Sequence, residues 1–90
     1  MLYALICTDK AEKLDVRKAN RDAHLAYIKD SGVVAMAGPF LDDAGQMCGS
    51  LLVLKVETRA EAEAWAANDP YAKAGLFAKV RIEAWNKVIG

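Results

Sequence analysis

The strongest constraint on the fold of this 90-residue chain is the order in which two kinds of apolar pattern alternate. Two segments carry apolar residues at the spacing of amphipathic helices, and four short runs have the length and composition of strands. The helical segments span residues 14–31 and 58–68, and the strand-like runs span residues 2–7, 33–38, 48–56 and 77–85. This order predicts an α+β, ferredoxin-like β-α-β-β-α-β fold, with a four-stranded antiparallel sheet and both helices on one face.

Turn and capping residues mark the limits of the first helix and of the central hairpin. Gly32 follows the first helical segment, where a C-cap favours a residue with positive φ, so we expect one continuous helix of about sixteen residues before it. Pro39 and Phe40 are expected to close the second strand. Residues 42–46, with the sequence Asp-Asp-Ala-Gly-Gln, are typical of a hairpin turn.

The second helix is predicted to begin at a capping box. Thr58 is followed three residues later by Glu61, so each side chain can bond a backbone N–H at the start of the helix. Within this helix, Ala60, Ala64 and Trp65 are predicted to face the core.

Both faces of the predicted sheet are apolar. In this arrangement the face opposite the helices is polar where it meets water. On the third strand, however, Leu51 and Val53 point to one face and Leu52 and Leu54 to the other, so both faces are apolar. The mass of 9.8 kDa allows a single domain spanning residues 1–90, and a hydrophobic fraction of 54% is high for that size. We therefore expect a homodimer or a higher oligomer, with a second copy covering the open face.

Charge and cysteine content limit the classes of function. Twelve basic residues balance twelve acidic ones, which argues against nucleic-acid and anionic-membrane partners. No apolar run approaches the roughly 20 residues of a transmembrane helix, and the N-terminus has the pattern of a strand rather than a signal peptide. Cys7 and Cys48 lack metal-binding spacing, so we predict two buried, reduced thiols in a cytoplasmic protein.

His24 is the only histidine and lies in the middle of the first helical segment. Steps of three and four residues place it on one helix face with Arg17, Arg21 and Ile28. Imidazole exchanges a proton near neutral pH, and guanidinium groups can hold an anionic substrate. The same residues would also suit an ordinary solvated helix face. No metal site is predicted from one histidine and two distant cysteines, and no cofactor fingerprint occurs in the chain.

Asp69 is the best carboxylate partner for His24. It ends the second helix, which lies beside the first in this fold, and a carboxylate that accepts an imidazole N–H fixes the tautomer. Asp69 also precedes Pro70, where it would serve as a cap for a short turn that follows. The two roles can coexist, because a carboxylate has several lone pairs.

Two glycines interrupt the strand patterns. Gly38 and Gly49 indicate either a bulge or a close approach of the backbone, with a bulge preferred. Ser50 follows Gly49 and offers a small hydroxyl near that position. Tyr71 is expected to form part of a pocket wall or of the core.

Several short motifs occur in order along almost the whole chain. They are Arg21-x-x-His24-Leu25, Ala37-Gly38-Pro39, Gly49-Ser50-Leu51, Ala64-Trp65, Asn68-Asp69-Pro70-Tyr71 and Gly75-Leu76-Phe77. Together they resemble the YciI-like family. The resemblance implies a dimeric α+β barrel of ferredoxin-like protomers, a pocket between helices and sheet, and a catalytic pair formed by His24 and Asp69. Some members of that family resemble dehydrochlorinases of chlorinated aromatic compounds, and muconolactone-isomerase-type enzymes share the barrel.

These observations lead to a main hypothesis and two alternatives. In the main hypothesis the chain is a cofactor-independent enzyme in which His24, oriented by Asp69, exchanges protons with a small-molecule substrate. Arg21 and Arg17 would hold an anionic group and Ser50 would add a hydrogen bond; elimination, isomerisation and hydrolysis all fit. The first alternative is a binding or interaction module with the same pocket and no turnover. A monooxygenase ranks last, because it rests on fold analogy alone.

Overall fold

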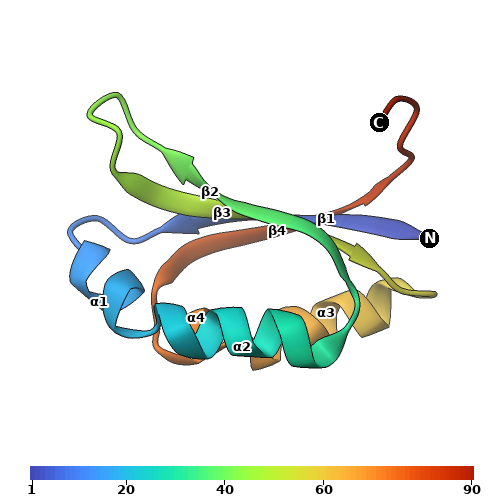
Figure 1. Ribbon diagram of the computed structural model, residues 1–90, viewed down its shortest axis with the longest axis horizontal. Helices are drawn as coiled ribbons and strands as arrows, with labels where there is room; N and C mark the ends of the chain where they lie inside the picture. The colour runs from blue at the N-terminus through green and yellow to red at the C-terminus, as the bar shows by residue number, and fades with distance from the viewer.

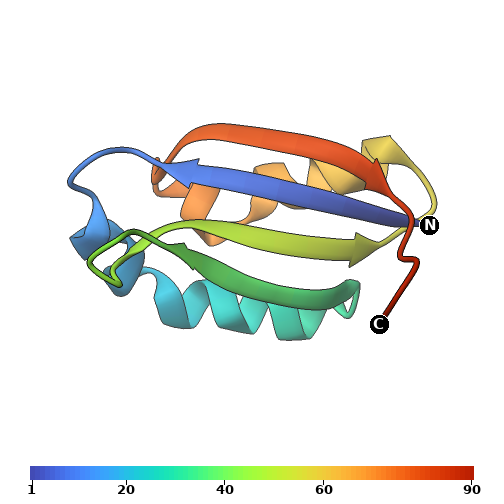
Figure 2. The same cartoon turned by 90° about the horizontal axis from the view of Figure 1, so that it is seen from above.

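A four-stranded antiparallel sheet carries all the helices on one face (Figure 1). The computed structural model describes residues 1–90, and the strands lie in the order β2-β3-β1-β4 (Figure 2). The strands are β1 (Leu2–Asp9), β2 (Val34–Leu41), β3 (Met47–Lys55) and β4 (Phe77–Trp85). The helices are α1 (Leu14–Ala19), α2 (Arg21–Ser31), α3 (Arg59–Asn68) and α4 (Pro70–Lys73). The predicted ferredoxin-like arrangement is confirmed. None of these helices is both long and apolar enough to cross a membrane.

The core lies between the sheet and the helices. Its buried residues come from the inward positions of β1 and β3 and from one face of α3: Tyr3, Leu5, Cys7, Leu52, Leu54, Ala62 and Trp65. Each buried leucine contributes roughly 1.5–3 kcal/mol relative to an exposed one. Trp65 is inward as predicted, whereas the prediction for Ala60 and Ala64 is wrong, since both are exposed. Ala62 takes their place, because the alanines of α3 offer too little apolar contrast to define its inner face.

The first helical segment is two helices rather than the single helix predicted. α1 ends at Ala19 and α2 begins at Arg21, and α1 lies at an angle to α2 (Figure 1). Asn20, between them, donates from its side-chain amide to the carbonyl of Val16 over 2.9 Å. Asparagine side chains compete in this way with the backbone ladder of a helix, which favours a break at this residue. The predicted C-cap is confirmed, with Gly32 in the left-handed region at φ +69°.

The central hairpin follows the prediction at its turn but not at the end of β2. Asp42 accepts hydrogen bonds from the backbone N–H groups of Ala44 and Gln46, both over 2.9 Å, and this closes the turn. β2 continues through Pro39 and Phe40 to Leu41 instead of ending before them. A proline is tolerated there because β2 is an edge strand, which needs no N–H on its outer side.

The start of α3 is capped as predicted. The backbone N–H of Glu61 donates to Oγ1 of Thr58 over 3.2 Å. The Glu61 carboxylate reaches back to the N–H of Glu57 over 3.1 Å, one residue earlier than the usual capping box.

The sheet face away from the helices is apolar over three strands and charged along the fourth. The apolar side chains on this face, which follow from the register with the core, include Ala4, Ile6, Met36, Phe40, Leu51 and Val53, with Leu2 and Trp85 at one end. Met36 and Phe40 remain 45% and 40% exposed. Along β4, Arg81 and Glu83 form an exposed ion pair. An apolar surface of this kind is typical of an interface between subunits.

We therefore expect the chain to dimerise through this face. Sedimentation at micromolar concentration should give a mass near twice 9.8 kDa, with an interface on the order of 2,000 Å² in total. Phe40→Lys, on the open face, should shift the equilibrium to monomers, whereas Ala64→Lys, at an exposed position of α3 on the helix side, should not. A wild-type chain that stays monomeric at this concentration would contradict the prediction.

The two cysteines lie in different environments, so the prediction of two buried thiols is wrong for Cys48. Cys7 is 2% exposed, whereas Cys48 is exposed. The β2–β3 register shifts between the pairs Phe40–Gly49 and Leu41–Met47, which leaves Cys48 as the extra residue of a bulge, turned outward. Gly49, beside it, also makes a close approach, because a Cβ at this position would collide with the carbonyl oxygen of Cys7.

Thiol chemistry should separate these two cysteines. Burial, followed by the nearby charge of Asp69, raises the pKa of Cys7 from its ordinary value of 9.0 to about 12. The neutral thiol therefore stabilises the fold fully below pH 9, and this contribution is lost as the pH rises towards 12. At neutral pH we expect a disulfide reagent to label one thiol per native chain and two per unfolded chain. Cys48→Ser should abolish the fast reaction and Cys7→Ser should not; rapid labelling of Cys7 in the native chain would refute this.

Candidate functional site

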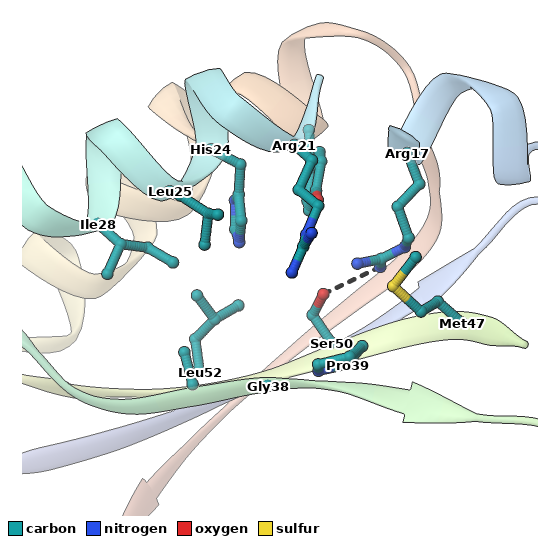
Figure 3. A pocket seen from close by; sticks show the side chains of 12 residues that line it. Arg17, Arg21, His24, Leu25, Ile28, Gly38, Pro39, Met47, Ser50 and Leu52 are labelled. Atoms are coloured by element: carbon teal, nitrogen blue, oxygen red, sulfur yellow. Dashed lines mark hydrogen bonds between the residues drawn. The ribbon is translucent and has the colours of Figure 1, made fainter. Parts of the chain in front are cut away.

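A cavity of about 210 Å³ lies between helix α2 and the strands β2 and β3 (Figure 3). Its polar lining comes from Arg17, Arg21, His24, Ser50 and Tyr71. Its apolar lining includes Leu25, Ile28, Ala37, Pro39, Met47 and Leu52. The site residues predicted from the sequence therefore line one cavity, except Asp69, which lies against His24.

His24 and Asp69 form a buried hydrogen bond. Nδ1 of His24, in α2, lies 2.7 Å from Oδ1 of Asp69, the residue before α4. His24 is 6% exposed and Asp69 is 2% exposed. Because an ionised carboxylate only accepts hydrogen bonds, Nδ1 donates, and in the neutral imidazole Nε2 then carries the lone pair. This is the tautomer that allows Nε2 to take a proton from a molecule in the cavity.

The turn that carries Asp69 holds the imidazole in two ways. The same Oδ1 atom accepts the backbone N–H of Tyr71 over 3.0 Å, so Asp69 caps α4 and contacts His24 with one oxygen. The Tyr71 ring stacks on the His24 ring, with centroids 3.9 Å apart and planes 13° apart. Burial raises the pKa of Tyr71, although Arg17 opposes this, so its phenol is neutral at physiological pH.

Arg17 lies at the other end of the cavity and is paired with Asp9. Its Nε and Nη2 atoms donate to the two carboxylate oxygens of Asp9 over 2.7 and 2.8 Å, and Nη2 also donates to Oγ of Ser50 over 2.9 Å. Burial lowers the pKa of Arg17, but hydrogen bonding and attraction to Asp9 outweigh it, so the pKa is raised overall. The guanidinium lies 4.7 Å from the Tyr71 ring centroid.

Asp9 is the residue of this site that the sequence analysis missed. The apolar run predicts a first strand that ends at Cys7, whereas β1 continues to Asp9. The signal available was a carboxylate eight positions before an arginine on the helix face that carries His24. A strand that ends at Cys7 does not bring the side chain of Asp9 next to that of Arg17, so their contact could not be expected.

Arg21 is the cation at the cavity that no carboxylate neutralises. It is exposed, it lines the cavity, and it makes no ion pair with another residue of the chain. Figure 3 shows the side chains of His24 and Arg21 extending from α2 towards the sheet, with Ser50 rising from β3 on the other side. No group of three or more His, Cys, Asp or Glu side chains is placed to hold a metal ion. The arrangement suits a small anionic molecule that exchanges a proton with His24.

Solved structures of other proteins share the fold of this chain. The chain is similar to 5-chloro-2-hydroxyhydroquinone dehydrochlorinase, TftG, from Burkholderia phenoliruptrix AC1100, solved in complex with 2,5-dihydroxybenzoquinone. The TM-score is 0.87 and the identity is 36%, over 96% of this chain and 94% of that one. An antibiotic biosynthesis monooxygenase shares the fold alone, with a TM-score of 0.61 and 11% identity over 99% of this chain and all of that one.

The sequence has relatives along its whole length. Protein YciI of Escherichia coli O6:H1 is 36% identical, and a protein of Haemophilus influenzae is 32% identical. In both cases the alignment covers 98% of this chain and 99% of the relative. Residues 1–86 match the YCII-related domain. The chain therefore belongs to the YCII-related domain family.

Proposed function

We propose that this chain is a small enzyme that works without a cofactor and uses His24 and Asp69 as an acid/base pair on a small anionic organic substrate. The observation that carries the proposal is the buried His24–Asp69 hydrogen bond in a cavity that also holds the unneutralised Arg21. Proton exchange at Nε2 and anion binding at Arg21 are the two functions that such a reaction requires. The similarity to a dehydrochlorinase supports an enzyme rather than a passive binding module.

The cavity favours a substrate the size of one substituted ring. A cavity of roughly 150 Å³ can enclose benzene, and this one measures about 210 Å³. The side chains of Leu25, Ile28 and Leu52 supply an apolar wall, while the polar groups gather around His24 and Ser50. A flat ring with one ionised oxygen would satisfy both parts of the lining.

Elimination of HCl is the reaction that we favour among elimination, isomerisation and hydrolysis. In the substrate, the hydroxyl beside the C–Cl bond first becomes a carbonyl, and its proton moves to the ring carbon that bears chlorine. The hydroxyl para to this carbonyl then loses its proton. The electron pair left on its oxygen forms the second carbonyl, shifts the ring double bond and expels chloride with the electron pair of the C–Cl bond. Removal of HCl from a chlorinated trihydroxybenzene in this way yields a hydroxyquinone, and the step needs no external oxidant. Nε2 of His24 would carry the proton, and Arg21 would hold a neighbouring phenolate oxygen.

Chloride release under anaerobic conditions tests the proposal. The substrate would be 5-chloro-2-hydroxyhydroquinone, on which the structural relative acts. We expect the protein to release chloride and form the quinone in equal amounts, well above the rate without protein. Binding of 2,5-dihydroxybenzoquinone without turnover of this substrate or its chlorinated analogues would instead support the binding module.

A further inference from the structure

We propose that Ser50 is the oxyanion donor of the cavity, and that Arg17 and Asp9 behind it orient its hydroxyl group. The inference rests on the proposed function, because it assigns the group that would hold the ionised oxygen of the substrate. It also gives a role to the buried Arg17–Asp9 pair, which does not contact His24 through any hydrogen bond.

The direction of the Ser50 hydroxyl follows from its partner. Ser50 is 3% exposed, and Arg17, which donates to its oxygen over 2.9 Å, is 2% exposed. A guanidinium has only donors, so Ser50 cannot give its own hydrogen to Arg17. In the hydrogen bonds of the structure Ser50 acts only as an acceptor. Its hydrogen is therefore free for a ligand, and the cavity is the space that Ser50 lines.

The guanidinium of Arg17 makes Ser50 a stronger hydrogen-bond donor, although Asp9 balances the charge of that guanidinium. Hydrogen bonds polarise one another in a low-dielectric interior, so a hydroxyl that accepts from a guanidinium donates more strongly. Asp9 holds that guanidinium through two hydrogen bonds, which keeps it in place and neutralises it. The ligand group that complements Ser50 is an oxygen with negative charge, such as a phenolate or an enolate.

The same geometry argues against Ser50 as a nucleophile. A serine nucleophile needs a base that accepts its proton. The neighbour of Ser50 is a guanidinium, which stays protonated, and no hydrogen bond joins Ser50 to His24. Because Arg21 lies on the α2 side and Ser50 on the β3 side (Figure 3), the two can hold an anion between helix and sheet.

Binding of two ring probes at one pH tests this role. At pH 8.5 the protein is titrated with 4-nitrophenolate, which carries an ionised oxygen, and with nitrobenzene, which has the same ring and nitro group but no such oxygen. We expect Ser50→Ala to weaken binding of the phenolate about tenfold and that of nitrobenzene less than threefold. Ser50→Thr, which retains a hydroxyl donor, should lose less phenolate affinity than Ser50→Ala. Ser31→Ala, outside the cavity, should change neither.

The outcomes also separate this inference from the proposed function. Unchanged phenolate affinity in Ser50→Ala, an equal loss for both probes, or no saturable phenolate binding by the wild type would overturn the donor role. Ser50→Gly, which also removes the hydroxyl, provides a second test if Ser50→Ala does not fold. Ser50-dependent phenolate binding without chloride release would leave the inference standing and remove the proposed reaction. Chloride release that depends on His24 but not on Ser50 would do the reverse.

Discussion

Replacing His24 by asparagine is expected to lower the turnover rate about 100- to 10,000-fold, which is the usual contribution of a positioned acid/base group. Asparagine is polar and of similar size, so its amide can still donate to the Asp69 carboxylate. This matters because Asp69 is only 2% exposed and has little access to water as another partner. The affinity for 2,5-dihydroxybenzoquinone and the thermal midpoint should change little. The measurement is chloride release, with circular dichroism as the check on folding. A variant that is folded and retains more than a tenth of the wild-type rate would exclude His24 as the acid/base group.

Asp69→Asn isolates the charge of the carboxylate from its geometry. Oδ1 of Asp69 accepts both the backbone N–H of Tyr71 and Nδ1–H of His24. In the asparagine variant the Tyr71 N–H still requires an acceptor, so the amide oxygen takes this position and the amide nitrogen faces away. The His24 tautomer and the cap of α4 are therefore expected to survive. Only the negative charge of the carboxylate is lost.

The expected rate loss for Asp69→Asn is consequently about tenfold, which is the difference between a charged and a neutral hydrogen bond. Asp69→Ala removes cap and partner together, so it should cost about 1 kcal/mol of stability and slow the reaction further. Nitrogen-15 NMR of the single histidine reads the tautomer directly. A change of tautomer in Asp69→Asn would show that the backbone N–H of Tyr71 does not control the amide orientation.

The contact between His24 and Asp69 could be predicted because each half depends on local sequence. The large apolar and the charged neighbours of His24 indicate which face of its helix points inward. The proline that follows Asp69 indicates that Asp69 stands at the start of a new turn. The ferredoxin-like order of elements then brings the two helical segments side by side. Caps, a proline and element order are short-range signals, so they can be read without coordinates.

The features that escaped prediction depend on contacts between distant segments or on weak local contrast. The meeting of Arg17 and Asp9 requires β1 to run two residues past Cys7, which its pairing with β4 supports. The break at Asn20 occurs where two donors share one acceptor, since both its side-chain amide and its backbone N–H donate to the carbonyl of Val16. Periodicity cannot resolve either case, because it reports neither strand length nor competition for one acceptor.

The Arg17–Asp9 pair leads to the largest expected effect on stability. The two side chains are 3% and 6% exposed and are joined by two hydrogen bonds of 2.7 and 2.8 Å. Removing one partner leaves the other charge buried without compensation, and such changes cost about 3–5 kcal/mol. We therefore expect Arg17→Met to lower the free energy of unfolding by that amount, a large share of the 5–15 kcal/mol typical of a whole domain.

A double-mutant cycle distinguishes a costly orphan charge from lost packing. Asp9→Leu with Arg17→Met replaces both charges by apolar side chains, and this double variant should recover most of the stability lost by Arg17→Met alone. Denaturant unfolding of the wild type, both single variants and the double variant measures the coupling between the two side chains.

The double variant also tests the role of Ser50. If it folds, its Ser50 hydroxyl has lost the guanidinium that orients it. Its preference for 4-nitrophenolate over nitrobenzene should therefore fall even though its stability is restored. A loss below about 1 kcal/mol in Arg17→Met would mean that water screens the pair, and the oriented donor at Ser50 would then lose its physical basis.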